Sequence, residues 1–288
     1  MALVMLILMN LAVMASLYIA LWFLGAFFGI YFDSQSMSGL FMMAAFFGFG
    51  GSFISLLMSK WMAKTSMGVQ IIDTPVNDTE VWLLETIHRL SQQAGLKMPE
   101  VGIFEGAPNA FATGWDKNNA LVAVSTGLLE MMSQEEIEGV LAHEISHVKN
   151  GDMVTMTLMQ GVLNTFVIFL SRLIASMVGR DRDGNTNYGT YMMVSFALEM
   201  VFSLFATAIL MWFSRYREYK ADEGAVDLSG ANGIYYALAK LGSIPKEQLS
   251  LPNDYKAFGI VGFLETFFAS HPPIEARLEH IKEYASEH

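Results

Sequence analysis

Long stretches of the sequence carry no charged side chain, and they constrain the fold more than any other feature. Residues 1–32 contain no Asp, Glu, Lys or Arg, and residues 39–59 form a second uncharged run after a polar break at residues 33–38. A helix needs about 20 apolar residues to cross the hydrocarbon core of a bilayer. The first run is too long for the apolar part of a cleaved signal peptide and has no basic residues before it. Residues 1–59 are therefore predicted to form a transmembrane hairpin with a very short outer turn.

Two further apolar runs follow later in the chain. Residues 153–170 are uncharged and the apolar pattern continues past Arg172, whereas residues 188–213 contain Glu199 as their only charged side chain. Two more transmembrane helices are predicted over residues 153–213, although helices buried in a soluble core remain an alternative, most of all for the run that carries Arg172. Arg172 can extend toward the membrane interface. Glu199 is either a functional acid in the membrane or a carboxylate facing a protein interior or a water-filled crevice.

The composition supports a membrane protein and excludes some partners. Hydrophobic residues make up 53% of the 288 residues and charged residues only 16%, whereas soluble domains carry about 25% charged residues. The net charge of −11 argues against nucleic acid as a partner, because nucleic-acid binding needs a basic surface. The sequence contains no cysteine, so any metal must be held by His, Asp or Glu.

The basic residues near the runs predict the orientation in the membrane. Four spans place both ends of the chain on one side, and basic side chains flank the spans on that shared side. The first outer turn has no basic residue, and the two arginines of the second are offset by two aspartates. Because cytoplasmic flanks are the basic ones, we expect the termini and both polar regions in the cytoplasm. The flanking basic residues are Lys60, Lys64, Arg215, Arg217 and Lys220, and the second turn holds Arg180, Asp181, Arg182 and Asp183.

The polar part of the chain is split into residues 60–152 and residues 214–288. The first part predicts a helix at about residues 78–94, capped by Asp78 or Thr79, followed by the strand-like runs EVGIFE, NAFATG and ALVAVS. The second part is mostly helical in pattern. Neither part is large enough to form a comfortable core alone. We therefore predict that the two parts pack together as one domain, mainly α with a small antiparallel sheet (α+β).

The stretch LAHEISHVKNGD, residues 141–152, lies on a predicted helix with clear start and stop signals. Ser133 is followed three residues later by Glu136, the pattern of a capping box, and Gly151 is the expected stop. The apolar residues between them recur at helical spacing. A helix is therefore predicted through the whole stretch, which fixes how its polar side chains project.

His143 and His147 lie one helical turn apart and project to the same side of this helix. Two imidazoles in that arrangement can reach one Zn²⁺ at about 2.0–2.1 Å. Glu144 follows the first histidine directly and is placed to accept a proton from water at the metal. The alternative is a chance match of His, Glu and His on an ordinary helix. The cap and the apolar face lower the expected frequency of such a match.

A zinc hydrolase needs a third protein ligand, and the acids of residues 214–230 are the candidates. Two of them, Glu218 and Asp222, are four residues apart on one helix face, so one can bind zinc while the other orients a ligand. An exposed helix with salt links between neighbouring turns explains the same spacing. The residues alone leave the third ligand open among Glu218, Asp222, Glu223 and Asp227.

Four motifs in this order, NAFATG, HEISHVKNGD, REYKAD and SHPPIEAR, together with the four apolar runs, make the chain similar to the HtpX family of heat-shock membrane metalloproteases. That family is related to the CAAX prenyl endoproteases. The resemblance covers essentially the whole chain, and no motif position departs from the pattern. It implies a zincin-like (gluzincin) site with one Zn²⁺ per chain, bound by His143, His147 and Glu218.

The resemblance also implies roles for four further residues. Glu144 would be the general base, and Asp222 would hold a zinc-bound histidine from behind. His271 would stabilise the oxyanion of the tetrahedral intermediate, and Asn109 would bind the substrate backbone at a sheet edge. From the residues alone, His271 before two prolines is more typical of a turn residue, whereas Asn109 after Pro108 is either a turn residue or, as we favour, a substrate-binding residue. The implied substrates are misfolded or damaged membrane proteins, cut on the cytoplasmic side for quality control during stress.

Other functions remain open on the residues alone. A prenyl-type endoprotease with one defined substrate would favour a much larger set of spans. A membrane zinc-binding scaffold or sensor without turnover would bind the metal but have no use for Glu144. A metal transporter would need polar ligands within the spans, where only Arg172 and Glu199 qualify.

Overall fold

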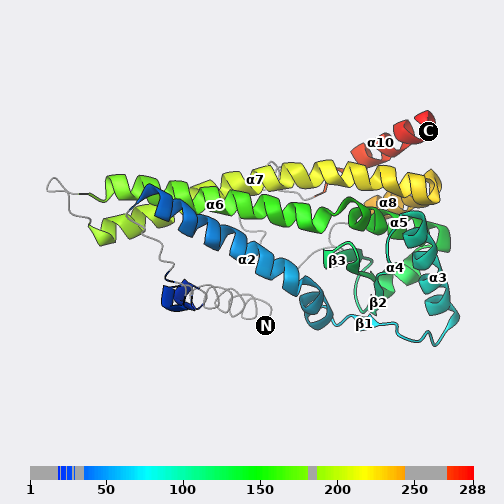
Figure 1. Cartoon of the computed structure of the whole chain (residues 1–288). Helices are drawn as coiled ribbons and strands as arrows, with labels where there is room; N and C mark the ends of the chain where they lie inside the picture. Colours follow the sequence, from blue (N-terminus) through cyan, green and yellow to red (C-terminus); the bar gives the residue numbers. More distant parts are fainter. Residues whose placement is uncertain are drawn as a thin grey trace. The chain divides into compact units, whose positions relative to one another are not determined.

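The computed structural model describes residues 19, 21–23, 25–27, 29, 36–180, 187–243 and 271–288. The predicted first span therefore lies almost entirely outside the described residues. In chain order the elements are α2 (Met37–Ser66), β1 (Gln70–Ile71), α3 (Asp78–Gln93), β2 (Glu100–Phe104), β3 (Ala110–Asp116), β4 (Asn119–Ser125), α4 (Thr126–Met131), α5 (Gln134–Asn150), α6 (Asp152–Val178), α7 (Tyr188–Ser229), α8 (Ala231–Ser243) and α10 (Ile274–Glu287) (Figure 1).

Three of the described helices, α2, α6 and α7, are long and apolar enough to cross a membrane. They coincide with the second, third and fourth predicted spans. Helix α7 continues without a break to Ser229, so the last predicted span and the start of the helical pattern predicted for residues 214–288 are one element. The described residues divide into two compact units, residues 1–56 with 156–210 and residues 57–155 with 211–288.

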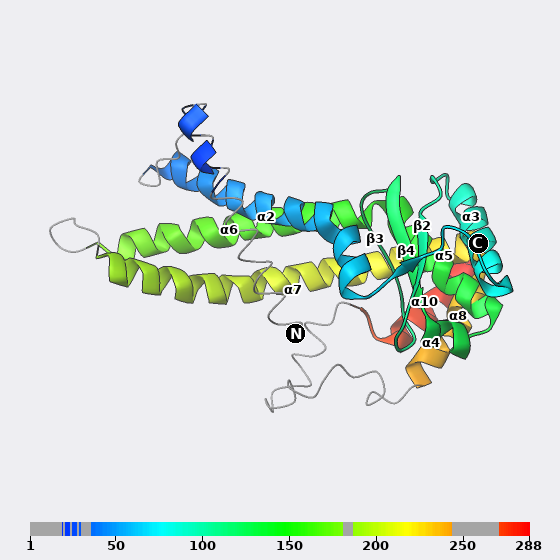
Figure 2. The same cartoon turned by 90° about the horizontal axis from the view of Figure 1, so that it is seen from below.

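In the first unit the three apolar helices lie side by side (Figures 1 and 2). Helices α2 and α6 approach closely at Gly48, where an added Cβ would lie 2.6 Å from the backbone N of Thr165. Small residues permit such close approach between membrane helices. Between α6 and α7, Arg172 Nε lies 3.7 Å from Glu199 Oε1. The two charges of the apolar runs therefore pair with each other.

Changing Gly48 to alanine is expected to destabilise the packing of α2 on α6 by about 1–3 kcal/mol, because the added methyl meets backbone atoms that cannot yield easily. Gly51 on the same helix is the matched control, since a Cβ there meets no atom within 4 Å. Thermal unfolding in detergent compares the two variants. A lower midpoint for Gly48→Ala and an unchanged or higher one for Gly51→Ala would support the packing, and equal midpoints would contradict it.

The sheet of the second unit has the strand order β1-β2-β4-β3. The outer pairs are antiparallel, but β2 and β4 are parallel in register from Glu100 opposite Leu121 to Phe104 opposite Ser125. The prediction of an antiparallel sheet was therefore wrong at its central pair. Strand β3 runs back along the outside, and the hairpin places β4 between β2 and β3. Every residue of β4 after Asn119 is buried, which is typical of a strand covered on both faces.

Helices cover one face of this sheet and form the main core (Figure 2). Val101, Val122 and Val124 of the sheet pack with buried side chains of α3, α5 and α8. Helix α3 matches the predicted helix, but its N-cap is Asn77, whose side chain accepts a hydrogen bond from the Glu80 N–H. The predicted caps, one or two residues later, were wrong because Asn77 already occupies the extended conformation that a cap requires.

Helix α5 has clear sequence signals at both of its ends. Ser133 and Glu136 form the predicted capping box, and Gly151 ends the helix with φ +68°. Gly139 on α5 packs directly on the first turn of α8, where an added Cβ would lie 2.2 Å from the backbone N of Ile234. The HEISH stretch is therefore held on a helix with both ends capped and one face in backbone contact with a neighbour.

Candidate metal centre

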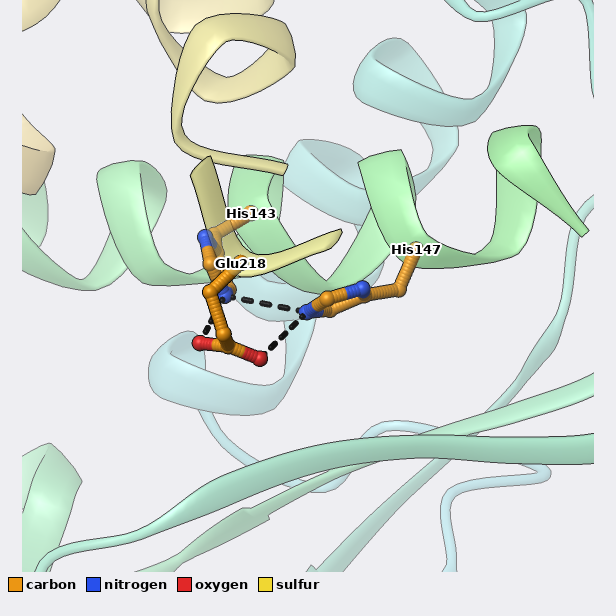
Figure 3. A group of neighbouring side chains, drawn as sticks. All are labelled: His143, His147 and Glu218. Atoms are coloured by element: carbon orange, nitrogen blue, oxygen red, sulfur yellow. Dashed lines mark hydrogen bonds and ion pairs between the residues drawn. The ribbon is translucent and has the colours of Figure 1, made fainter. Parts of the chain in front are cut away.

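Three side chains from two helices converge in the second unit. His143 and His147 project from α5 and Glu218 from α7, and their metal-binding atoms lie within 4.8 Å of one another (Figure 3). The two Nε2 atoms are 3.1 Å apart, and Glu218 lies 3.6 Å from Nε2 of His143 and 3.4 Å from Nε2 of His147. His143 and Glu218 are buried. Two imidazole nitrogens and a carboxylate therefore face one small volume.

The donor set fits a zinc ion. Ligand atoms about 2.0–2.1 Å from a tetrahedral ion lie about 3.3–3.4 Å apart. The two Nε2 atoms are 3.1 Å apart, and each lies near this spacing from one carboxylate oxygen of Glu218: His143 Nε2 is 3.6 Å from Oε2 and His147 Nε2 is 3.4 Å from Oε1. Three protein ligands leave the fourth position for water or substrate, as hydrolytic zinc sites require. Among the residues that the structure describes, no other group of three His, Cys, Asp or Glu side chains meets this condition.

The side of the His143 ring away from the other two proposed ligands contacts Asp222, which Arg277 binds in turn. His143 Nδ1 lies 2.9 Å from Asp222 Oδ1, and the Arg277 guanidinium donates to both oxygens of Asp222 at 2.6 and 2.8 Å. Asp222 and Arg277 are buried. Burial opposes a positive charge on His143, but the hydrogen bond to Asp222 outweighs it and raises the pKa of the ring. The contact at Nδ1 turns Nε2 toward the other ligands.

His147 is held in a similar way from the opposite side. Its Nδ1 lies 2.5 Å from Asp152 Oδ2. Burial disfavours the charged ring, yet the contacts with Asp152 and Glu218 prevail and raise the pKa of His147 to about 10. A metal ion must displace that proton, so metal binding is expected to release protons and to weaken as the pH falls.

The remaining predicted site residues lie around this group. Glu144 is half-buried on α5, directly after His143. His271 Nδ1 contacts Glu218 Oε2 at 2.8 Å, and 64% of the His271 side chain is exposed. Asn109 is exposed and immediately precedes the edge strand β3, with its backbone N–H donating to Ser125 Oγ at 2.8 Å. The structure thus brings Glu144 and His271 to the metal group and places Asn109 at a sheet edge.

A comparison with known protein families matches residues 77–285 to peptidase family M48. This range is more than half of the chain and contains the whole metal group. The chain belongs to peptidase family M48. M48 membership makes it a metalloendopeptidase, and the three apolar helices make it a membrane protein. The family implies a bound metal, and the group of His143, His147 and Glu218 can hold one.

Relatives of the M48 chain extend the match over nearly its full length. Protease HtpX of Stenotrophomonas maltophilia (strain R551-3) is 53% identical over 275 residues, which cover 93% of each chain. Protease HtpX of Histophilus somni (strain 2336) is 54% identical over 252 residues, covering 86% of this chain and 87% of the relative. The resemblance found in the motifs is confirmed.

A solved structure is also similar to this M48 chain. The crystal structure of S. mikatae Ste24p aligns with a TM-score of 0.64 at 20% identity, covering 97% of this chain and 65% of that chain. The likeness at this identity concerns the fold. It supports a fold for this chain like that of the solved chain.

Three contacting residues of the M48 site were not predicted. Asp152 and Arg277 each end a motif already quoted, HEISHVKNGD and SHPPIEAR, and Arg217 directly precedes Glu218. Their position within the motifs was the available signal. Their role could not be read from spacing, because each contact joins elements that are distant in the sequence, such as Arg277 on α10 and Asp222 on α7.

Proposed function

We propose that the chain is a zinc-dependent endopeptidase that hydrolyses peptide bonds of misfolded or damaged membrane proteins on the cytoplasmic side of the bacterial inner membrane. The observation that carries this proposal is the convergence of His143, His147 and Glu218 within 4.8 Å of one another, with Glu144 directly after His143 on α5. Names of the relatives, Protease HtpX, support a protease of the same kind. The basic flanks of the apolar helices support the cytoplasmic orientation.

Zinc, when bound, supplies a Lewis acid that polarises the scissile carbonyl and lowers the pKa of water. Glu144 takes the proton of the attacking water and passes it to the leaving amine. Its place directly after His143 puts the carboxylate next to the ligand group without making it a ligand. Asp222 and Arg277 keep the His143 ring fixed during this transfer.

His271 is proposed to donate a hydrogen bond to the developing oxyanion. Its ring touches Glu218 Oε2 and is largely exposed, so it lies where a substrate approaching from solvent meets the metal group. A preorganised donor at this position stabilises charge that appears only in the transition state.

Asn109 and strand β3 are proposed to bind the substrate backbone. Among the strands that the structure describes, β3 pairs with β4 alone, so its other edge can take an extended peptide. The Asn109 backbone is fixed by Ser125, whose N–H donates to the Asn109 carbonyl at 2.9 Å. Recognition through backbone hydrogen bonds suits a protease of damaged proteins, since it needs an unfolded segment rather than a defined sequence.

Removal of the metal tests the proposal. The chain purified in detergent is expected to contain one zinc and to cut an unfolded membrane protein. Cleavage should cease when a chelator strips the zinc and return when zinc is added back, because the water can be activated only in the loaded site. His147→Ala purified in parallel controls for a contaminating protease. Cleavage that survives metal removal, or that His147→Ala retains, would contradict the proposal.

A further inference from the structure

The metal group is supported on both sides by an aspartate that is itself paired with an arginine. On the α7 side, Asp222 contacts His143 Nδ1 and is held by Arg277. On the other side, Asp152 contacts His147 Nδ1, and Asp152 Oδ1 lies 3.0 Å from Arg217 Nε. The two histidines thus have equivalent supports, although those supports come from different elements.

The Asp152 support is buried and built at a helix start. Asp152 is only 5% exposed and is the first residue of α6, directly after the left-handed turn at Gly151. A carboxylate in the first turn of a helix is favoured by the unpaired backbone N–H groups there. This placement stabilises the ionised form of Asp152 before it contacts any side chain. It also fixes the carboxylate at the distance that His147 requires.

Arg217 joins this support to the third ligand. It precedes Glu218 on α7, and 15% of its side chain is exposed. The ion pair from Arg217 to Asp152 therefore fixes the start of α6 to the turn of α7 that carries Glu218. The contact of Asp152 with His147 holds one proposed ligand. The contact of Asp152 with Arg217 holds the segment of α7 that carries the other, Glu218.

We propose that Asp152 and Arg217 are positioning residues for the metal site, acting through His147. A carboxylate at Nδ1 keeps the ring proton on that nitrogen and leaves the lone pair of Nε2 for the metal. It also fixes the rotation of the His147 ring before the metal binds. Metal binding therefore costs no further rotational entropy of this ring. Arg217, 3.0 Å from Asp152 Oδ1, holds the other oxygen of that carboxylate toward His147. The inference rests on His143, His147 and Glu218 being the metal ligands.

The zinc affinity of Asp152→Ala and Asp152→Asn, measured by competition with a chromophoric chelator, tests the inference. Loss of a carboxylate that orients a ligand lowers metal affinity by about 10- to 100-fold, and we expect this for Asp152→Ala. Asp152→Asn keeps the size and one acceptor oxygen but loses the charge, so a smaller loss is expected. If Asp152→Ala does not fold, Asp152→Asn carries the test alone.

Glu223→Gln is the matched control. Like Asp152, Glu223 is a carboxylate that contacts a histidine, since it lies on α7 at 3.1 Å from His280. It does not touch the metal group. Its zinc affinity should equal that of the wild type. Thermal unfolding of the metal-stripped proteins separates positioning from folding, because positioning requires that the stripped Asp152→Asn protein unfolds near the wild-type midpoint.

Three results can be distinguished. Weaker zinc binding by both Asp152 variants, with an unchanged midpoint of stripped Asp152→Asn, supports the inference. Wild-type affinity in both variants overturns it, as does a loss of affinity that is matched by unfolding of stripped Asp152→Asn. When either of these contrary results is found and the wild type binds zinc but His147→Ala does not, the proposed metal site stands and only the role of Asp152 and Arg217 is refuted. If His147→Ala binds zinc as tightly as the wild type, the proposed metal site itself has failed.

Discussion

Changing Glu144 to glutamine is expected to lower the rate of peptide hydrolysis by about 10²- to 10⁴-fold, the usual contribution of a general base. Glutamine has the same shape as glutamate but cannot accept the proton of the attacking water. The proposed metal ligands His143, His147 and Glu218 are untouched, so zinc should remain bound. The predicted result is therefore a loaded, folded and inactive protein.

The measurement compares cleavage of an unfolded protein by wild type and Glu144→Gln at equal zinc content. Glu138→Gln is the control, since Glu138 lies on the same helix but pairs with Arg89 at 2.8 Å. Equal rates for wild type and Glu144→Gln would remove Glu144 from the mechanism. If the loaded wild type cuts none of several unfolded substrates, a zinc-binding scaffold without turnover becomes the better explanation.

Changing Gly139 to alanine is expected to destabilise the second unit by about 3 kcal/mol, the upper part of the usual range for overpacking. Three backbone atoms of α8 lie within 2.8 Å of the position that the new methyl would take. Backbone atoms cannot turn away as a flexible side chain can. Helices α5 and α8 must therefore separate, and α5 carries two of the metal ligands.

Thermal unfolding of the stripped and zinc-loaded proteins measures this effect, with Gly51→Ala again as the control. Alanine ordinarily favours a helix over glycine by about 0.5–1 kcal/mol, so the sign of the change separates packing from propensity. Weaker zinc binding should accompany the lower midpoint of Gly139→Ala. A midpoint equal to or above that of the wild type would show that α8 can shift at no cost.

Local signals predicted the metal helix well. The capping box of Ser133 and Glu136, the stop at Gly151 and the spacing of His143 and His147 all act within a few residues, and the structure has each of them as predicted. The same holds for the apolar runs that became α2, α6 and α7. The spacing of residues in the sequence is sufficient to predict structural features that depend on neighbours along one helix.

Contacts between distant segments could not be predicted in this way. The parallel pairing of β2 with β4 depends on which side of β4 the strand β3 takes, and this is set by contacts between strands rather than within one strand. One signal was present, because the unbroken apolar run ALVAVS is typical of a central strand rather than an alternating edge strand. The choice of Glu218 over its acidic neighbours likewise needed the three-dimensional position of α7 beside α5.

The order of the ligands along the chain has a consequence for biosynthesis. Synthesis proceeds from the N-terminal side, so the ribosome makes His143 and His147 first. It then makes all of α6 and the apolar part of α7 before it reaches Glu218. A nascent chain that has not yet produced both apolar helices cannot complete the metal group. With the proposed ligand set, the peptidase is therefore inactive until α6 and the apolar part of α7 have been synthesised.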